Sequence, residues 1–422
     1  MPISAVEIPE RRQENVMQHS VSEIRYCGEL FEAFYDVGST REGGVTRLGY
    51  SAVEDEMHRR FEALARELGC GVFTDEVGNT FASNGEEGDY YLLGSHLDSV
   101  VDGGRYDGVA GVIAGLMVVR RLQEEEEVRL PLRVAAFRCE ESSNFGLCTI
   151  GSGLIAGQEK YSSDIGSLRS RDGERLDEIF QKRGLSFSPK NISGIKEYLE
   201  LHIEQGKVLE ETGTEIGIVS TIAGPRRFRF ILRGMAEHSG ATPMGLRNDA
   251  LCAAAEVILA VERIGREEAV HQSVATVGVV ENRPNVLNVI PGEVALGIDL
   301  RGIEEESLDR MEQALRSRAQ DIAKSRGATC LEMKIGSVPP VAMSRRVQRG
   351  LERAASRLKI SSRNMPSGAG HDAMSFAALC DTGMVFIPCR HGVSHNRKEF
   401  ASLSSICDGA AVICEYLKGE AV

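Results

Sequence analysis

Residues 90–108, YYLLGSHLDSVVDGGRYDG, contain the pattern that decides the fold. They open with an apolar run, Tyr90 to Leu93, that is long enough to be a buried strand. A loop rich in glycine and aspartate follows, and residues 109–121 then have the apolar spacing of a helix. This order of strand, polar loop and helix is typical of an open α/β sheet, in which functional residues lie at the carboxyl ends of strands.

The loop has more ionisable side chains than a tight turn requires. His96, Asp98, Asp102 and Asp107 place one imidazole and three carboxylates among glycines. Histidine nitrogen and aspartate oxygen both bind zinc at about 2.0–2.2 Å, so the loop is a candidate metal site. The alternative is a polar turn in which an aspartate caps the next helix, and this stretch alone favours neither interpretation.

The composition of the chain limits its class. Its 422 residues are enough for two domains, and 42% hydrophobic and 26% charged residues are typical of a globular protein. The formal net charge of −13 argues against a nucleic-acid-binding protein, and there is no apolar stretch of about 18 residues to span a membrane. The N-terminal segment lacks the apolar core of a signal peptide, and the cysteines include no CxxC pair. We therefore expect a cytoplasmic protein that binds neither nucleic acid nor membrane.

Two further stretches join a predicted strand to candidate metal or acid–base residues. Residues 132–137 (LRVAAF) lead into Glu140 and Glu141, so that one carboxylate could bind metal while the other transfers protons. A solvated acidic turn is the alternative. Residues 198–205 (YLELHIEQ) alternate as a strand does and carry His202. A histidine alone in a strand is more often a hydrogen-bonded structural residue than a metal ligand.

The pattern changes near residue 224. From there to about residue 336 it predicts strand, helix, strand, strand, helix and strand, the split βαβ order of ferredoxin-like domains. We therefore expect an α/β protein with two domains. A discontinuous metal-binding catalytic domain would contain residues 1–223 and 337–422, and a smaller inserted α+β domain would contain residues 224–336.

An arginine and a glycine-rich turn are candidates for binding an anion. Arg301 ends an apolar strand (ALGIDLR), where its guanidinium would either bind a carboxylate or form a salt bridge at the rim. Residues 367–372 (SGAGHD) precede a predicted helix over residues 373–380, and backbone N–H groups in such a turn can bind an anion. A plain helix-entry turn is the alternative.

Taken together, these motifs resemble those of the M20 metallopeptidase family. The resemblance is to its amidase branch, which includes N-carbamoyl-L-amino-acid hydrolases, allantoate amidohydrolases and β-ureidopropionases. It extends from about residue 15 to residue 420. The matching stretches, in the family's order, are GSHLDSVVDGGRYDG (94–108), CEESSNFG (139–146), LELHIEQG (199–206), AEHSGATPMGLRNDA (236–250), NVIPG (288–292), SGAGHDAM (367–374) and GVSHNRKEF (392–400).

The resemblance implies roles for individual residues. Two divalent ions per subunit, zinc or manganese with cobalt or nickel also possible, would be bound by His96, Asp107 as the bridge, Glu141, His202 and His395. Glu140 would be the general base, and Asp98 would orient His96. His238, contributed by the inserted dimerisation domain of the partner subunit in a homodimer, would stabilise an oxyanion. The implied substrate-binding residues are Gln205, Asn288, Arg301, Gly370 and His371.

The function implied by the resemblance is that of a binuclear metal amidohydrolase. It would cleave a linear C–N amide bond of an N-carbamoyl or ureido acid and release ammonia and carbon dioxide from the carbamoyl group. The alternatives are an aminoacylase or dipeptidase that uses the same metals, and a non-catalytic homologue. The chain departs from many relatives in residues 142–145 (SSNF), at Ser239 and in residues 389–391 (CRH). Arg390 and His391 would either add positive charge to the pocket or face solvent.

Overall fold

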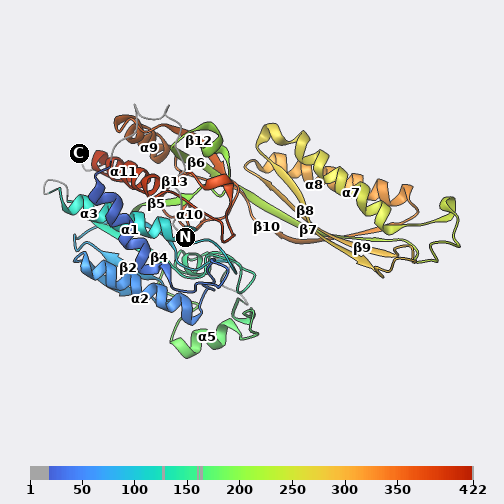
Figure 1. Ribbon diagram of the computed structural model, residues 1–422, viewed down its shortest axis with the longest axis horizontal. Helices are drawn as coiled ribbons and strands as arrows, with labels where there is room; N and C mark the ends of the chain where they lie inside the picture. Colours follow the sequence, from blue (N-terminus) through green and yellow to red (C-terminus); the bar gives the residue numbers. More distant parts are fainter. Residues whose placement is uncertain (1–18, 126–128, 159–160, 162–164, 421–422) are drawn as a thin grey trace, which may run out of the picture. The chain divides into compact units, whose positions relative to one another are not determined.

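The computed structural model describes residues 19–125, 129–158, 161 and 165–420 (Figure 1). The chain divides into two compact units, each with its own hydrophobic core. Unit 1 contains residues 1–220, 343–365 and 370–422, and unit 2 contains residues 221–342 and 366–369. Among the described residues, no helix is both long enough and apolar enough to cross a membrane.

A nine-stranded mixed sheet forms the centre of unit 1, with the order β1-β2-β4-β3-β5-β13-β6-β11 and with β12 paired to β6. The neighbours β4, β3, β5 and β13 are parallel, whereas β1 and β2 form an antiparallel hairpin. The carboxyl ends of four strands therefore meet at one edge. The strands are β1 (Gly71–Thr74), β2 (Thr80–Ser83), β3 (Tyr90–His96), β4 (Leu132–Phe137), β5 (Ile195–Ile203), β6 (Ile216–Ile222), β11 (Val341–Ala342), β12 (Ser362–Ser367) and β13 (Asp381–Ile387).

Helices cover this sheet. α3 (Val109–Gln123) is apolar on nearly every side and is almost wholly buried, as expected of a core helix. α1 (Val21–Tyr35) and α11 (Leu403–Glu420) pack beside it (Figure 1). All seven residues of β3 are buried, which is the usual condition of a parallel strand covered on both faces. The remaining helices of this unit are α2 (Ala52–Glu67), α4 (Ile150–Ile155), α5 (Leu176–Arg183), α6 (Val208–Thr212), α9 (Arg345–Arg357) and α10 (Ala373–Phe376).

The helix predicted over residues 373–380 is too long. α10 ends at Phe376, and the next residues form a turn because β13 begins at Asp381 and must pair with β5. The α/β class of the prediction is confirmed.

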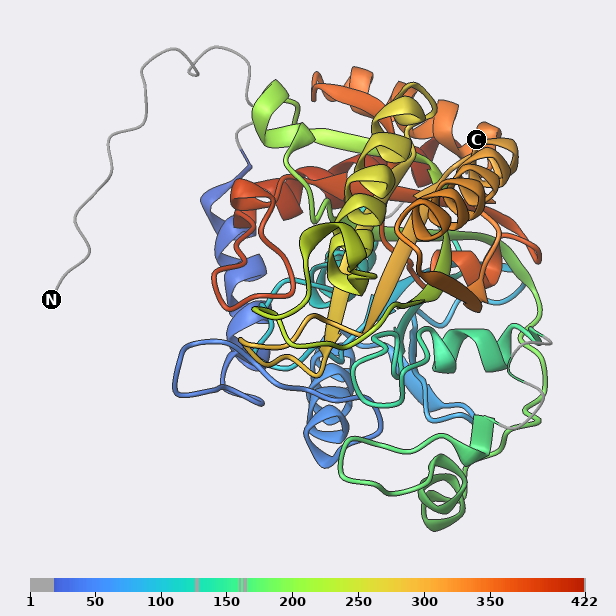
Figure 2. The same ribbon diagram turned by 90° about the vertical axis from the view of Figure 1, so that its right-hand side faces the viewer.

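Unit 2 is a four-stranded antiparallel sheet with two helices on one face. Its element order, β-α-β-β-α-β, is the predicted one, and the strands lie in the order β10-β7-β9-β8. Alternate residues of β7, Phe228, Phe230 and Leu232, are buried in the core beneath the helices, which lie side by side in yellow and orange in Figure 2. The elements are β7 (Gly224–Arg233), α7 (Ala250–Glu267), β8 (Val274–Arg283), β9 (Glu293–Gly302), α8 (Glu305–Ser325) and β10 (Thr329–Ser337).

The two points where the chain enters and leaves unit 2 are paired. β6 leads into β7 through a single residue, and β10 leads into β11. Val341 of β11 is the antiparallel partner of Ile222 of β6. The whole of the smaller fold is therefore inserted between two neighbouring strands.

Candidate metal centre

Five candidate ligands reach one region of unit 1 because four parallel strands end there. His96 ends β3, and His202 is the second-last residue of β5. Asp107 follows β3, Glu141 follows β4 and His395 follows β13. The parallel pairing brings these strand ends to the same edge of the sheet.

The five side chains form two groups that share Asp107. One group is His96, Asp107 and His202, and the other is Asp107, Glu141 and His395; within each group the candidate ligand atoms lie within 4.8 Å of one another. Oδ1 of Asp107 is 3.4 Å from His96 Nε2 and 3.0 Å from His202 Nε2. Oδ2 is 3.5 Å from His395 Nε2, which lies 3.1 Å from Glu141 Oε1. One carboxylate therefore faces both groups, with one oxygen toward each.

Backbone groups orient two of the imidazole rings. His96 Nδ1 donates to the Asp98 carbonyl at 3.2 Å, and His202 Nδ1 donates to the Ile203 carbonyl at 2.9 Å. Because a carbonyl only accepts, Nδ1 carries the proton and Nε2 is left to face Asp107, as in many metal-binding histidines. Gly108 allows α3 to begin against His96: its φ is +67°, and a Cβ there would lie 2.5 Å from the His96 ring.

The buried imidazoles are surrounded by carboxylates. Burial lowers the pKa of His96, but hydrogen bonds to carboxylates, Asp107 first, outweigh this and raise that pKa well above its usual range. Hydrogen bonds to Asp107 and Glu141 raise the pKa of His395 to about 10. Burial acts to raise the pKa of Asp107, yet the imidazoles, His202 foremost, hold it well below its usual range. The raised imidazole pKa values show that the carboxylates give this centre an excess of negative charge. Divalent cations would neutralise that charge in place of the bound protons.

Glu140 lies beside the two groups and belongs to neither. Its Oε2 is 3.8 Å from His96 Nε2, and burial raises its pKa well above its usual range. Asp98 fixes the backbone there: Oδ1 accepts the Glu140 N–H and Oδ2 accepts the Glu141 N–H, both at 3.0 Å. Asp98 Oδ1 is also 3.4 Å from His96 Nδ1. Asp98 thus contacts three of the predicted residues, and not His96 alone.

A buried ion pair that the sequence did not reveal supports the loop after β4. Glu54 in α2 accepts hydrogen bonds from the Cys139 N–H and from Arg138 Nη1, both at 2.9 Å. Cys139 has a φ of +52°, so the chain turns sharply just before Glu140. In the sequence Glu54 is an ordinary acidic residue of a first helical turn, which is why no pattern distinguishes it.

Two of the predicted substrate-binding side chains lie against the ligands. Gln205 Nε2 donates to Asp107 Oδ2 at 2.7 Å and is 3.2 Å from His395 Nε2. The His371 ring packs edge-on against His202, with centroids 4.5 Å apart, and burial lowers the pKa of His371 well below its usual range. Gly370 directly precedes it in the turn after β12.

His238 and Asn288 lie together in unit 2. The backbone N–H of Ser239 donates to the Asn288 carbonyl at 3.0 Å. His238 Nδ1 accepts the N–H groups of Gly240 and Ala241 at 3.1 and 3.2 Å. The ring proton is therefore on Nε2, on an exposed side chain, where it can be donated.

Arg301 is also in unit 2, and its guanidinium is held in one orientation. Its Nε donates to Asp299 Oδ2 at 2.8 Å, and its Nη1 donates to the Gly368 carbonyl at 2.6 Å. The salt bridge predicted as one alternative is thus present. This salt bridge fixes the orientation of the guanidinium but leaves it accessible, since 29% of the Arg301 side chain is exposed.

Three of the residues that differ from those of many relatives make contacts within this chain. The Arg390 guanidinium lies 3.8 Å from the centroid of the Phe400 ring. The His391 N–H donates to Glu210 at 2.6 Å, and its side chain is 77% exposed, so the solvent-facing alternative is the one observed. Asn144 donates to a backbone carbonyl at 2.8 Å and supports its own loop.

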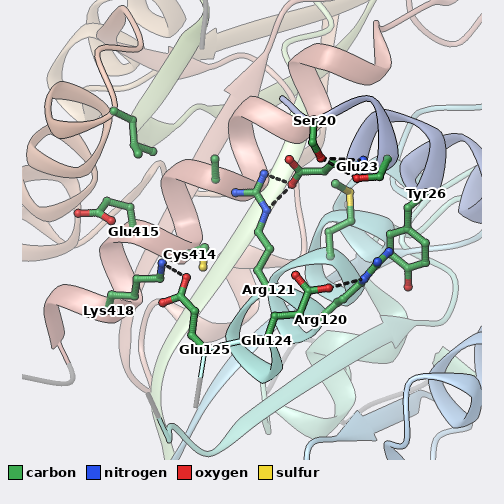
Figure 3. A pocket seen from close by; sticks show the side chains of 14 residues that line it. Ser20, Glu23, Tyr26, Arg120, Arg121, Glu124, Glu125, Cys414, Glu415 and Lys418 are labelled. Carbon is green, nitrogen blue, oxygen red and sulfur yellow. Dashed lines mark hydrogen bonds and ion pairs between the residues drawn. The ribbon is translucent and has the colours of Figure 1, made fainter. Parts of the chain in front are cut away.

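A separate hollow of about 360 Å³ lies among α1, α3 and α11, and Figure 3 shows the side chains that line it. It contains none of the candidate ligands. Its charged side chains largely neutralise one another, in the pairs Arg121–Glu23, Lys418–Glu125 and Arg120–Glu124. We assign it no chemistry.

The profile of peptidase family M20/M25/M40 matches residues 92–419, and the chain belongs to this family. It is 37% identical to an N-carbamoyl-L-amino acid amidohydrolase of Geobacillus stearothermophilus, over 90% of this chain and 94% of that one. It is 34% identical to an allantoate amidohydrolase of Escherichia coli, also over 90% and 94%. A crystal structure of an amidase of the hydantoinase/carbamoylase family from Burkholderia multivorans has a TM-score of 0.86 at 34% identity, and covers 96% of this chain and 98% of that one. Within its family the chain is an amidohydrolase, which acts on carbon–nitrogen bonds other than peptide bonds.

Proposed function

We propose that this chain is a binuclear metal amidohydrolase that cleaves a linear C–N amide bond of an N-carbamoyl or ureido acid. A carbamoyl group would leave as ammonia and carbon dioxide. The observation that carries the proposal is the position of Asp107, whose two oxygens face two separate groups of ligand atoms. Two groups joined by one carboxylate suit a pair of ions that act on one substrate.

The chemistry of the donor atoms fits two divalent ions. His96 and His202 would hold one ion, Glu141 and His395 the other, and Asp107 would bridge them. Imidazole nitrogen and carboxylate oxygen suit zinc or manganese, and cobalt or nickel can use the same donors. When bound, such ions polarise an amide carbonyl and lower the pKa of water from about 16 toward about 7.

The surrounding side chains would transfer protons and stabilise charge. Glu140, buried beside His96, takes the proton of the attacking water and passes it to the leaving nitrogen. Asp98 holds Glu140 in place through its backbone N–H. His238 donates its Nε2 proton to the oxyanion that develops on the carbonyl oxygen.

The remaining polar groups would select the substrate. Arg301, with Asn288 and the Gly370 backbone, binds the substrate carboxylate, and its fixed guanidinium provides the planar fork that this requires. Gln205 would bind the carbamoyl group. Its Oε1 is buried and has no hydrogen-bond partner among the described residues, so it offers an acceptor to an amide NH₂.

The test is ammonia release by the purified chain, loaded in turn with zinc and manganese. We expect turnover of N-carbamoyl amino acids, allantoate or another linear ureido acid. We expect no turnover of N-acetyl amino acids or of dipeptides. Hydrolysis of those compounds alone would identify an aminoacylase or dipeptidase instead. A metal-loaded enzyme that turned over no ureido acid would contradict the substrate assignment.

Replacement of Arg301 by alanine should mainly weaken substrate binding. A charge-assisted hydrogen bond contributes roughly 1.5–3 kcal/mol, so we expect KM to rise about 10–100-fold for a carboxylate substrate, with a smaller change in kcat. An esterified N-carbamoyl amino acid has no carboxylate for Arg301 to bind, so its KM should change little when Arg301 is replaced. The matched control is Arg229→Ala on the neighbouring strand, where the arginine pairs with Glu281. Equal KM values for the Arg301 and Arg229 variants would show that Arg301 has another role.

We also propose that the active form is a homodimer in which His238 acts in the partner's site. Unit 2 supports this with exposed apolar side chains on its edge strand β10: Leu331, Met333 and Ile335. Exposed apolar side chains on an edge strand are suited to contact with another chain.

Mixing two inactive variants tests this arrangement. Co-expressed His238→Ala and Glu140→Gln chains should recover about a quarter of wild-type activity, because half of the dimers are mixed and each has one intact site. Neither variant expressed alone should have activity. If His238 acted within its own subunit, the mixture would stay inactive.

A further inference from the structure

Glu399 lies at the centre of a hydrogen-bond network that joins two ligand loops. It is buried, 6% exposed, and among the described residues it forms no ion pair with lysine or arginine. Its Oε1 accepts the backbone N–H groups of Tyr106 and Asp107 at 2.9 and 3.0 Å. Its Oε2 accepts the hydroxyl of Ser394 at 2.8 Å. A buried carboxylate whose partners are the backbone of one ligand and the neighbour of another has no evident role except to hold them.

Ser394 extends the network to the ligand side chains. Its Oγ is 2.9 Å from Asp107 Oδ2, and Ser394 directly precedes His395. The hydroxyl therefore lies between the carboxylates of Glu399 and Asp107, on the side of Asp107 that faces the second ligand group. Ser394 has a single hydroxyl proton, which it can donate to either carboxylate, so Glu399 and the Asp107 side chain share one donor.

The loop after β3 is shaped around this carboxylate. A Cβ at Gly104 would lie 2.0 Å from Glu399 Oε1 and 2.1 Å from its Cδ. No side chain larger than that of glycine fits at this position unless Glu399 moves away. The glycine of the loop motif is thus explained by the space that Glu399 occupies.

We propose that Glu399 is a positioning residue for the metal centre. It ties the loop that carries Asp107 to the loop that carries His395, so that each Asp107 oxygen faces its own ligand group. It contacts no substrate atom, and it acts on metal affinity through its neighbours. The inference rests on the proposed function, because it presumes that these groups hold metal ions.

The test is calorimetric titration of the metal-free chain with zinc alone. Removing a residue that orients a metal ligand typically weakens binding about 10–100-fold, and we expect this loss for Glu399→Ala. Glu399→Gln should stay within about threefold, because its amide oxygen can accept both N–H groups and its NH₂ can donate to Ser394. Rescue by the isosteric variant would show that the hydrogen bonds of this side chain, and not its charge, hold the ligand loops.

The matched control is Asp75→Ala. Asp75 also accepts two backbone N–H groups, from Val77 and Asn79 at 2.9 Å, and one side-chain donor, Asn79 Nδ2 at 2.8 Å. It does so in the turn between β1 and β2, outside the ligand loops, so its loss should leave zinc affinity unchanged.

Several outcomes would overturn the inference. One is equal zinc affinity in Glu399→Ala and the unsubstituted chain; another is equal weakening in the alanine and glutamine variants, which would assign the effect to charge. If Glu399→Ala fails to fold, Ser394→Ala, which removes the hydroxyl that contacts both Glu399 Oε2 and Asp107 Oδ2, must weaken zinc binding or the inference fails. An unsubstituted chain that bound neither zinc nor manganese would refute the proposed function itself, which the other outcomes do not.

Discussion

The Glu140→Gln variant is expected to lose about 10²–10⁴-fold in kcat while it keeps its bound metal. An amide of the same shape cannot accept a proton, so the attacking water and the leaving nitrogen lose their proton carrier. The hydrogen bond to Asp98 uses the backbone N–H and is retained, so the loop should keep its conformation. Ammonia release measures the rate, and elemental analysis of the purified variant measures the metal content.

The control for this experiment is Glu124→Gln. Glu124 pairs with Arg120 on the surface, and 64% of its side chain is exposed. Its replacement should change neither kcat nor the metal content, since exposed ion pairs contribute little to stability. If kcat of Glu140→Gln stayed near the wild-type value, another group would have to be the general base.

The Asp107→Ala variant should lose both metal ions together. Every other candidate ligand belongs to one group, whereas Asp107 belongs to both. Its loss also leaves His202 without the carboxylate that it faces, and leaves His395 with Glu141 alone. We expect activity to fall by more than the roughly 10²–10³-fold that removal of a single oxyanion donor costs. Elemental analysis should show the metal content falling toward zero.

Asp102→Asn is the matched control, because Asp102 lies in the same loop but outside both groups. Its Oδ1 accepts the hydroxyl of Thr40 at 2.8 Å, a bond that asparagine can keep. Metal content should be unchanged. Two ions retained by Asp107→Ala would mean that the two groups do not share this residue as a ligand.

Much of the candidate centre could be predicted because its residues stand at the ends of apolar strands. His96 closes the run from Tyr90, and Glu141 follows residues 132–137, so each is marked by the pattern before it. Parallel strands place their carboxyl ends at one edge whatever their order, and the residues therefore converge. For His202 and His395 local pattern was not sufficient, and the resemblance to a family supplied the assignment.

The supporting residues could not be predicted, for a physical reason. Glu399 and Glu54 act by accepting backbone N–H groups from segments distant in the chain, and a backbone donor leaves no trace in a sequence. Asp98 shows the same limit: its proximity to His96 was evident, whereas its hold on the Glu140 backbone required the structure. The strand β12 was missed because SRNMPS lacks the apolar alternation of a half-buried strand.

The pairing of Ile222 with Val341 has an evolutionary consequence. A segment whose two ends are already side by side can be gained, exchanged or lost as one unit, a cassette, because a short turn would rejoin the remaining chain. The predicted metal ligands lie outside this cassette, whereas His238, Asn288 and Arg301 lie inside it. Ancestral recombination at this junction would therefore give one inherited reaction a new choice of substrates.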